Sequence, residues 1–307
     1  MKKYITIFCA VFLAVLSVSA QNSEQDYLNR YNLLLKNLGP SGVGMETLLD
    51  RWEAAYPDDV NMVLGKFSYY FAKSQKTEVV RKEQPKFLGQ PPVMTLKDSL
   101  GHSVNYFEET FFVDSLFGKA EYQIDKIIKK YPDRLDFRFL KVSALIAYEK
   151  ESPDMALSEL KALVNYNCLD SPSWEYPNVK ADQDFFKAAI QDFCFAFYKT
   201  GTVSSYSAFR DISELMLKYY PEDPLFMDNM GSYYLVAAGN PKMALKYYNK
   251  VLKKNPGDIT AIKNSILLAR NEKNRKLEKK SLQRLAKYSQ DSTERKSAEI
   301  RLESLHK

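Results

Sequence analysis

The stretch that decides the fold runs from Glu222 to Pro256 and reads EDPLFMDNMGSYYLVAAGNPKMALKYYNKVLKKNP. Apolar residues recur in it every three or four positions, which is the period of an amphipathic helix. Pro241 fits the first turn of a helix, and Pro256 cannot continue the helix before it. The stretch therefore predicts two helices, at about 223–238 and 242–254.

The second of these helices has a residue spacing that recurs in the chain. A small residue is followed after four, three and five positions by two larger apolar residues and a proline, as in Ala244, Tyr248, Val251 and Pro256. The spacing is repeated at Ala120, Ile124, Ile127 and Pro132, and, with the proline lost, at Ala156, Leu160, Leu163 and Cys168. A small residue lets two helix backbones approach, and the larger residues continue the same face.

A short motif around proline marks the places where one helical pattern ends and the next begins. It occurs at Tyr56-Pro57-Asp58, Tyr131-Pro132-Asp133, Tyr220-Pro221-Glu222 and Asn255-Pro256-Gly257. Two acidic pairs, Asp58-Asp59 and Glu222-Asp223, follow these prolines directly. We expect their carboxylates to cap helix N-termini, a structural role rather than that of paired catalytic acids.

These patterns resemble the tetratricopeptide repeat family. Besides the second-helix spacing, Leu64-Gly65 and Met230-Gly231 supply the large and small pair of the family's first helix, and Tyr234 follows at the expected distance. The resemblance covers most of residues 24–271 and is most regular at 222–256. It implies an all-α fold, an α-solenoid of about five helical hairpins.

The same periodicity predicts the other helices of a repeat domain at residues 21–271. We expect them at about 24–37, 45–56, 59–74, 111–130, 134–149, 154–166, 182–199, 203–219 and 259–271. Residues 272–307 are charge-rich with apolar residues at helical spacing, and predict a helical C-terminal cap. Basic residues from Lys273 to Lys287 fit the polar outer face of such a cap, and binding to an anionic surface is the alternative.

The segment 75–110 interrupts the repeats. Prolines and glycine between Pro85 and Pro92 exclude a helix there. Two short apolar runs, Val93–Leu96 and Ser103–Phe107, flank Asp98-Ser99-Leu100-Gly101 and predict a β-hairpin with Gly101 at positive φ. A long excursion of this kind either binds a partner or covers the fold.

The first twenty residues have the character of a signal peptide. Lys2 and Lys3 precede an apolar run from Ile5 to Leu16, and small residues end at Ala20, where cleavage is expected. A lipid anchor at Cys9 is disfavoured because this cysteine follows Phe8 inside the apolar run. The mature chain has no second apolar run of about 20 residues, so we expect no transmembrane segment in it. These features predict export to the periplasm or envelope.

Nothing in the sequence forms a recognisable catalytic or metal-binding set. His102 and His306 are the two histidines, and neither has a partner at suitable spacing. Cys168 and Cys194 are expected to be unpaired thiols, because the predicted helices place them far apart. The formal charge is +6, and loss of Lys2 and Lys3 leaves +4, which is too small to indicate nucleic acid. We expect no enzyme activity and no cofactor.

The family pattern indicates which side chains line the inner face of the repeats, where partners bind. Carried over residue by residue, it gives Met62, Lys66, Tyr69, Asp228, Ser232 and Leu235. Trp174, in an irregular stretch between prolines, either fills a gap between hairpins or anchors an interface. We therefore predict a non-catalytic scaffold or adaptor that binds a protein or peptide through the groove or the 75–110 insertion, within an envelope complex. The alternative is an exported glycan-binding protein, because aromatic residues lie near the insertions.

Overall fold

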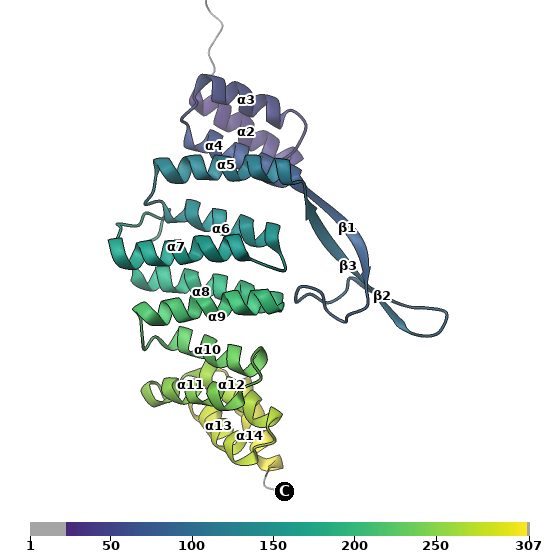
Figure 1. The fold of residues 1–307 in the computed structure, drawn as a ribbon, viewed down its shortest axis with the longest axis vertical. Coiled ribbons are helices and arrows are strands. Elements are labelled where there is room, and N and C mark those ends of the chain that lie inside the picture. Colours follow the sequence, from purple (N-terminus) through teal and green to yellow (C-terminus); the bar gives the residue numbers. More distant parts are fainter. Residues whose placement is uncertain (1–22, 306–307) are drawn as a thin grey trace, which may run out of the picture. The chain divides into compact units, whose positions relative to one another are not determined.

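The computed structural model describes residues 23–305, in which it contains thirteen helices and one small three-stranded antiparallel sheet (Figure 1). The described chain divides into two compact units. Unit 1 comprises residues up to Glu78 together with Thr110–Tyr131, and unit 2 comprises Val79–Glu109 and the chain from Pro132 onward. The predicted signal peptide, its cleavage site at Ala20 and Cys9 lie outside the described residues. Within residues 23–305, no helix is long and apolar enough to cross a membrane.

Unit 1 is built from four helices, each of which contacts the next along the chain. They are α2 (Glu24–Leu38), α3 (Met45–Ala55), α4 (Val60–Ser74) and α5 (Asp114–Lys130). The indole of Trp52 is fully buried between the α2 rings of Tyr27, which stacks on it at 5.9 Å, and Tyr31. Large aromatic side chains therefore fill the space between the first helices of this unit.

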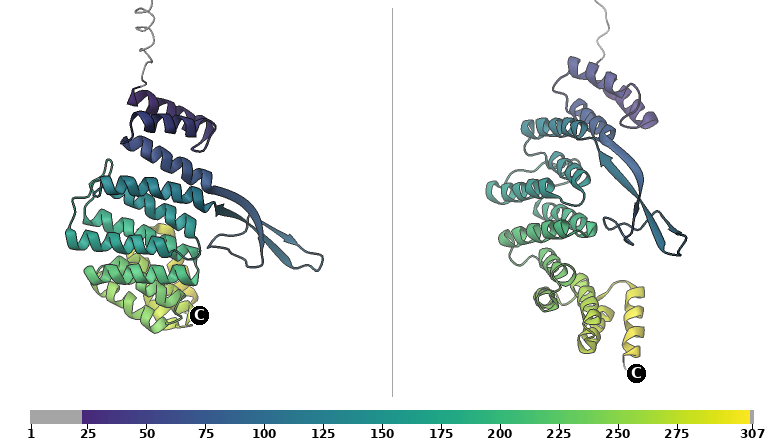
Figure 2. Two further views of the ribbon diagram at one scale, coloured as in Figure 1. Left: turned by 45° about the horizontal axis from the view of Figure 1, so that its top comes forward. Right: turned by 45° about the vertical axis from the view of Figure 1, so that its right-hand side comes forward.

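Unit 2 contains the other nine described helices, and most consecutive helices again lie side by side (Figures 1 and 2). They are α6 (Leu135–Glu149), α7 (Asp154–Asp170), α8 (Gln183–Thr200), α9 (Val203–Tyr219), α10 (Pro224–Val236), α11 (Pro241–Lys254), α12 (Ile259–Asn271), α13 (Arg275–Tyr288) and α14 (Ser292–Ser304). Helix α7 also contacts α9, and α10 contacts both α8 and α12. The predicted helices are confirmed, most to within two residues at each end, and the tail forms two helices.

The proline motifs end and begin helices as predicted. Tyr56, Tyr131 and Tyr220 are each the C-cap of a helix, with φ between −138° and −126° and ψ of 72°. After two of them, a carboxylate caps the next helix: Asp59 accepts from the backbone N–H of Asn61, and Asp223 from that of Leu225. The stop residue and the start residue thus sit within one short turn, which keeps the connection between helices short.

Two glycines of the first-helix pattern lie against neighbouring side chains. Gly65 of α4 faces Leu49 and Tyr31, and Gly231 of α10 faces the fully buried ring of Tyr248 in α11. A Cβ atom on Gly231 would overlap this ring, at 2.7 Å from Cδ1. The glycine is therefore required by packing, since its backbone has ordinary helical geometry.

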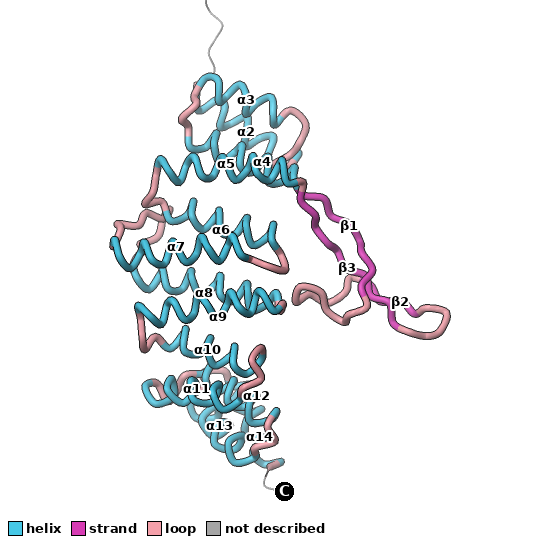
Figure 3. The backbone as a smooth tube through the Cα atoms, viewed as in Figure 1, coloured by secondary structure: helices cyan, strands magenta, loops and turns pink. Residues whose placement is uncertain are grey.

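The insertion contains the predicted hairpin and one further strand (Figure 3). Strand β2 (Met94–Lys97) pairs antiparallel with β3 (Ser103–Phe112), and Gly101 has the expected positive φ of 83°. Strand β1 (Gln75–Lys82) pairs with the other side of β3 and was not predicted. The helix expected from 111 starts instead at Asp114, because β3 continues through Phe112 to pair with β1.

Two further predictions concern single residues of unit 2. Cys168 and Cys194 are both free thiols, as expected. Trp174 lies between α7 and α8, where its indole N–H donates to Asn167 Oδ1 at 2.9 Å and its ring stacks on Phe186 at 6.3 Å. Tyr166 meets the indole edge to face at 5.5 Å. These contacts correspond to the gap-filling role considered for this tryptophan.

Candidate functional site

The outer part of the insertion exposes an unusual number of apolar side chains. We call five of them the apolar sheet surface: Val79, Val93, Met94, Leu96 and Leu100, all within unit 2. Their exposed fractions range from 45% for Met94 to 79% for Leu100. Several exposed apolar side chains on one small element are a common mark of an interaction site.

The strand register organises part of this surface. Met94 is paired with Tyr106 and Leu96 with Val104, so these four side chains lie on one face of the sheet. Leu100 lies in the turn after β2, which is fixed because Asp98 Oδ1 accepts from the backbone N–H groups of Leu100, at 2.9 Å, and His102, at 2.8 Å. The surface is therefore presented on an ordered hairpin rather than on a loose loop.

The connection between β1 and β2 contains a tight turn at residues 87–90. The backbones of Phe87 and Gln90 exchange two hydrogen bonds, of 3.0 and 2.9 Å. The two residues between them, Leu88 and Gly89, have φ of 47° and 73°, as a two-residue hairpin turn requires. The ring of Phe87 packs on Phe107 of β3 at 5.8 Å, which fastens the turn to the sheet.

Gly89 also brings this turn against the end of helix α8. A Cβ atom at Gly89 would overlap the carbonyl oxygen of Lys199 and lie 2.9 Å from its carbonyl carbon. Only glycine satisfies both the positive φ and this close approach. The insertion is thus anchored to the helices of unit 2 through backbone contact.

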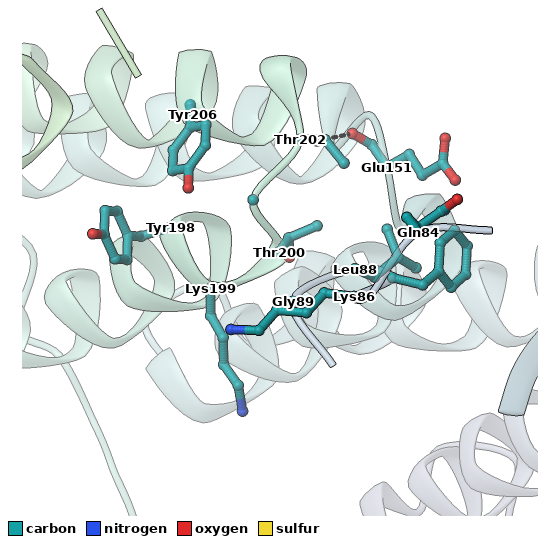
Figure 4. A pocket seen from close by; sticks show the side chains of 12 residues that line it. Gln84, Lys86, Leu88, Gly89, Glu151, Tyr198, Lys199, Thr200, Thr202 and Tyr206 are labelled. Carbon is teal, nitrogen blue, oxygen red and sulfur yellow. Dashed lines mark hydrogen bonds between the residues drawn. The ribbon is translucent and has the colours of Figure 1, made fainter. Parts of the chain in front are cut away.

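A pocket of about 560 Å³ lies beside this anchor point (Figure 4). Its wall is formed by the 84–89 segment, by Glu151 and by the α8–α9 junction. Two tyrosines from this junction, Tyr198 and Tyr206, meet edge to face at 5.7 Å. Burial raises the pKa of Tyr198 above its usual value, and the nearby Tyr206 adds to the rise, so its hydroxyl stays protonated at neutral pH.

The polar groups of the pocket suit recognition of a neutral or acidic ligand. Lys86 and Lys199 bring two positive charges, and Glu151 one negative charge. Thr202 closes the floor by donating a hydrogen bond from its hydroxyl to the Glu151 carbonyl oxygen at 2.6 Å (Figure 4). Tyrosine rings with hydroxyl and ammonium donors offer a stacking surface with hydrogen-bond donors at its rim.

The inner-face residues predicted in unit 1 are engaged with helix α3. Met62 is fully buried, and Lys66 is 6% exposed. The Lys66 ammonium pairs with Asp50 at 2.9 Å and with Glu53. Burial alone would lower the pKa of Lys66, but these two carboxylates raise it above its usual value. Tyr69 donates its hydroxyl hydrogen to Glu46 at 2.6 Å, so α3 and α4 are joined by a row of polar contacts.

The inner-face residues predicted in unit 2 belong to α10. Asp228 is 6% exposed and lies beside Asp258, and its Oδ1 has no hydrogen-bond partner among residues 23–305. The Ser232 hydroxyl accepts from Asn264 Nδ2 at 3.3 Å, and Leu235 is half-buried against the cluster around Tyr248. The structure therefore brings three predicted residues onto one helix, mostly in contact with its neighbours.

Sequence reasoning missed the pocket beside Gly89. The three parts of its wall are distant in the chain, and none carries a motif. The available signal was the Leu88-Gly89 pair before the two prolines, which marks a tight turn but not the helix it touches. Within the described part of the chain, no group of three or more His, Cys, Asp or Glu side chains could hold a metal ion.

We expect Gly89→Ala to release the insertion from α8. The added methyl group would overlap the Lys199 carbonyl and strain the backbone, so the turn must move. Hydrogen exchange of the 84–90 amides should accelerate at least about tenfold, which corresponds to about 1.4 kcal/mol of lost local stability.

Gly101→Ala is the matched control for this experiment. Gly101 also has positive φ, but no atom lies within 4 Å of its missing Cβ. Its substitution should therefore cost only backbone strain in the hairpin turn and leave the 84–90 amides protected. Equal exchange of these amides in both variants would show that the contact with Lys199 does not hold the insertion.

Two comparisons of the sequence with known proteins are negative. A scan against protein-family models finds no match. A search of curated proteins also finds no similar sequence.

Proposed function

We propose that this chain is a non-catalytic adaptor of the cell envelope that docks a protein or peptide segment on its insertion. In this proposal the helices form an α-solenoid of tetratricopeptide-like hairpins, and cleavage after Ala20 releases the chain into the periplasm or envelope. The contact of Gly231 with Tyr248 supports the repeat assignment, since it places a small residue where the repeat pattern requires two helices to touch.

The apolar sheet surface is the observation that carries the proposal. Burying its five side chains against a partner would remove a large apolar area from water, at about 25 cal/mol per Å². Rigid presentation reduces the entropy lost on binding, and the fixed turns at 87–90 and 98–102 provide it. The positive and negative charges of residues 75–110 balance, and Lys82 is paired with Glu109 at 3.1 Å, so the surface would select a partner mainly through its apolar side chains.

An extended peptide segment fits the sheet best. The strand order is β1-β3-β2, so β1 and β2 are the two edges. An extended segment that adds to an edge gains backbone hydrogen bonds, and its alternate side chains reach the exposed face. Met94 and Leu96 lie two positions apart on β2 and so share one face of the sheet, where the alternate side chains of such a segment would contact them.

The test is site-specific photocrosslinking in an envelope extract. A photoreactive residue replaces Leu100, and a second version also carries Met94→Glu and Leu96→Glu. We expect a defined crosslinked partner from the first version and at least about a tenfold loss from the second.

The control makes the same kind of substitution, from an apolar residue to glutamate, at an exposed position on a helix. Leu169 of α7 is 70% exposed, so Leu169→Glu should leave the crosslink at Leu100 intact. Crosslinking from position 100 that survives the two sheet substitutions, or that Leu169→Glu weakens as strongly as they do, would reject the proposal. Far-UV circular dichroism establishes that each variant is folded.

Glycan binding is the second candidate function, and the pocket of Tyr198 and Tyr206 favours it. Sugar rings stack on tyrosine faces, and their hydroxyls would meet the donors of Lys86 and Lys199. Calorimetry against a panel of oligosaccharides tests this candidate, with Tyr206→Ala as the variant that should abolish the heat. Absence of heat from every oligosaccharide removes it.

A further inference from the structure

The positive charge of this protein is concentrated in one short segment. Residues 270–288, from the end of α12 to the end of α13, contain eight Lys and Arg and two Glu, a net charge of +6. This equals the formal charge of the whole chain, so the other residues are balanced. A local excess of this size favours an anionic ligand over a merely solvated face.

A buried carboxylate of this segment holds one of these cations, Arg270, together with Arg301 of α14. Glu278 is 4% exposed and lies on the inner side of α13. Its Oε1 accepts from Arg270 Nε and from Arg301 Nε, both at 2.9 Å, and its Oε2 accepts from Arg301 Nη2 at 3.3 Å. The hydrogen bond from Arg301, followed by that from Arg270, holds the pKa of Glu278 below its usual value, so the carboxylate stays ionised.

This arrangement fixes two guanidinium groups while leaving them accessible. The Arg270 and Arg301 side chains remain 50% and 45% exposed. Arg270 uses only Nε toward Glu278, so both of its terminal amino groups remain available as donors. One carboxylate neutralises one of the two guanidinium charges, and the pair keeps an excess positive charge.

These groups line a pocket of about 380 Å³ that is separate from the one beside the insertion. Its wall consists of Arg270, Lys273, Arg275, Glu278, Arg301, Ser304 and Leu305. Four cations and one carboxylate give the lining a net charge of +3. No salt bridge among the described residues engages Lys273 or Arg275, whereas Arg270 and Arg301 are already oriented.

The first turn of α13 adds donors on the same side. Asn274 caps this helix by accepting from the backbone N–H of Leu277 at 3.0 Å, and Arg275 follows directly. A helix N-terminus carries partial positive charge, which reinforces the cations around the pocket. The site thus combines fixed guanidinium groups, exposed cations and a helix terminus around one cavity.

We propose that this pocket, the C-terminal cationic pocket, binds a phosphate monoester through Arg270, Lys273 and Arg301. Guanidinium groups match phosphate oxygens in paired hydrogen bonds, and a dianion balances the excess charge better than a single carboxylate does. The volume exceeds that of a bare phosphate, so it also accommodates the group that carries the ester. Leu305 offers that group an apolar contact. This proposal does not depend on the docking function of the insertion.

The experiment is isothermal titration of the purified chain with glycerol 3-phosphate at constant ionic strength. Glycerol and sodium sulfate are the neutral and inorganic comparison ligands. A second arm measures binding to phosphatidylcholine vesicles with and without phosphatidic acid, which carries the same phosphate monoester as a lipid headgroup. Binding of the soluble ester, or binding that requires phosphatidic acid, supports the proposal and identifies the source of the phosphate.

Three variants decide whether the pocket is responsible. Arg270→Gln should weaken binding at least about tenfold, since it removes the free donors and leaves Arg301 on Glu278. Lys273→Gln should weaken binding about threefold to tenfold. Because Lys273 is exposed, this second variant should fold and keeps the test decisive if Arg270→Gln does not. Lys296→Gln, an exposed cation of α14 outside the pocket, should leave binding unchanged. No binding of either probe, equal affinity for sulfate, or equal losses in all three variants overturns the proposal.

Discussion

Gly231→Ala should destabilise unit 2 by about 3 kcal/mol, although alanine is normally the better helix former by about 1 kcal/mol. The added methyl group would overlap the ring of Tyr248, at 2.7 Å from Cδ1 and 2.8 Å from Cζ. This ring is fully buried, so it cannot swing into solvent, and α10 and α11 must separate. Urea unfolding gives the free energy of unfolding, and hydrogen exchange of the α10 and α11 amides localises the loss.

Two other helical glycines calibrate this result. At Gly118 of α5 nothing lies within 4 Å of the missing Cβ, so Gly118→Ala should stabilise the chain by about 0.5–1 kcal/mol. At Gly65 the nearest atom is Leu49 Cδ2 at 2.8 Å, the far end of a flexible side chain, and an intermediate loss is expected. A Gly231→Ala variant as stable as the parent would show that the α10–α11 contact is not tight.

The prolines and small residues made most helices predictable, because their effects are local. A proline ends a helix whatever its surroundings, and after two of the prolines an acidic residue supplies the next N-cap. Tyr220 and Asp223 show the rule within a single turn, the first as a C-cap and the second as an N-cap. Gly231 could also be given a place in the repeat from sequence, as the small residue of the first-helix pair Met230-Gly231.

Strand β1 was not predictable in the same way. Its sequence, QKTEVVRK, has two adjacent valines and no alternation of apolar and polar residues. The strand forms because β3 is available beside it, and the preference comes from that pairing rather than from the segment itself. The same pairing extends β3 through Phe111 and Phe112, which helical periodicity had assigned to α5.

The candidate sites depend still more on long-range contacts. The approach of Gly89 to Lys199, and of Arg301 to Glu278, joins segments that no local pattern relates. Sequence reasoning identified the insertion and the basic tail as segments of interest. It could not show that each one borders a cavity, because a cavity is a property of the packed chain.

Asp228→Asn should raise the free energy of unfolding at neutral and alkaline pH, where the buried carboxyl group destabilises the folded chain. Burial, and then the nearby charge of Asp258, raise the pKa of Asp228 from 3.8 to about 8. The folded chain therefore holds a proton that the unfolded chain releases as the pH rises above about 4. Stability conferred by the protonated carboxyl is complete below that pH and is lost progressively up to about pH 8.

The asparagine variant keeps the shape of the side chain but cannot ionise. We expect it to match the parent in free energy of unfolding near pH 4 and to exceed it at pH 8 by on the order of several kcal/mol. Urea unfolding at pH steps between 4 and 8 measures both curves. Their difference should grow with pH and level off once Asp228 is ionised in the folded parent as well.

Two other substitutions determine the cause of this effect. Asp258→Asn keeps a good N-cap for α12, which Asp258 provides by accepting from Ala261 at 3.0 Å, and removes the neighbouring charge. It should flatten the pH dependence only in part, because burial of Asp228 is the larger cause. Asp182 is the exposed N-cap of α8, and the hydrogen bond from the Phe185 N–H lowers its pKa. Asp182→Asn should therefore lower the free energy of unfolding at neutral pH, whereas Asp228→Asn raises it. Parallel curves for Asp228→Asn and the parent would mean that Asp228 is ionised in the folded chain at neutral pH, and that the space around it is open to water.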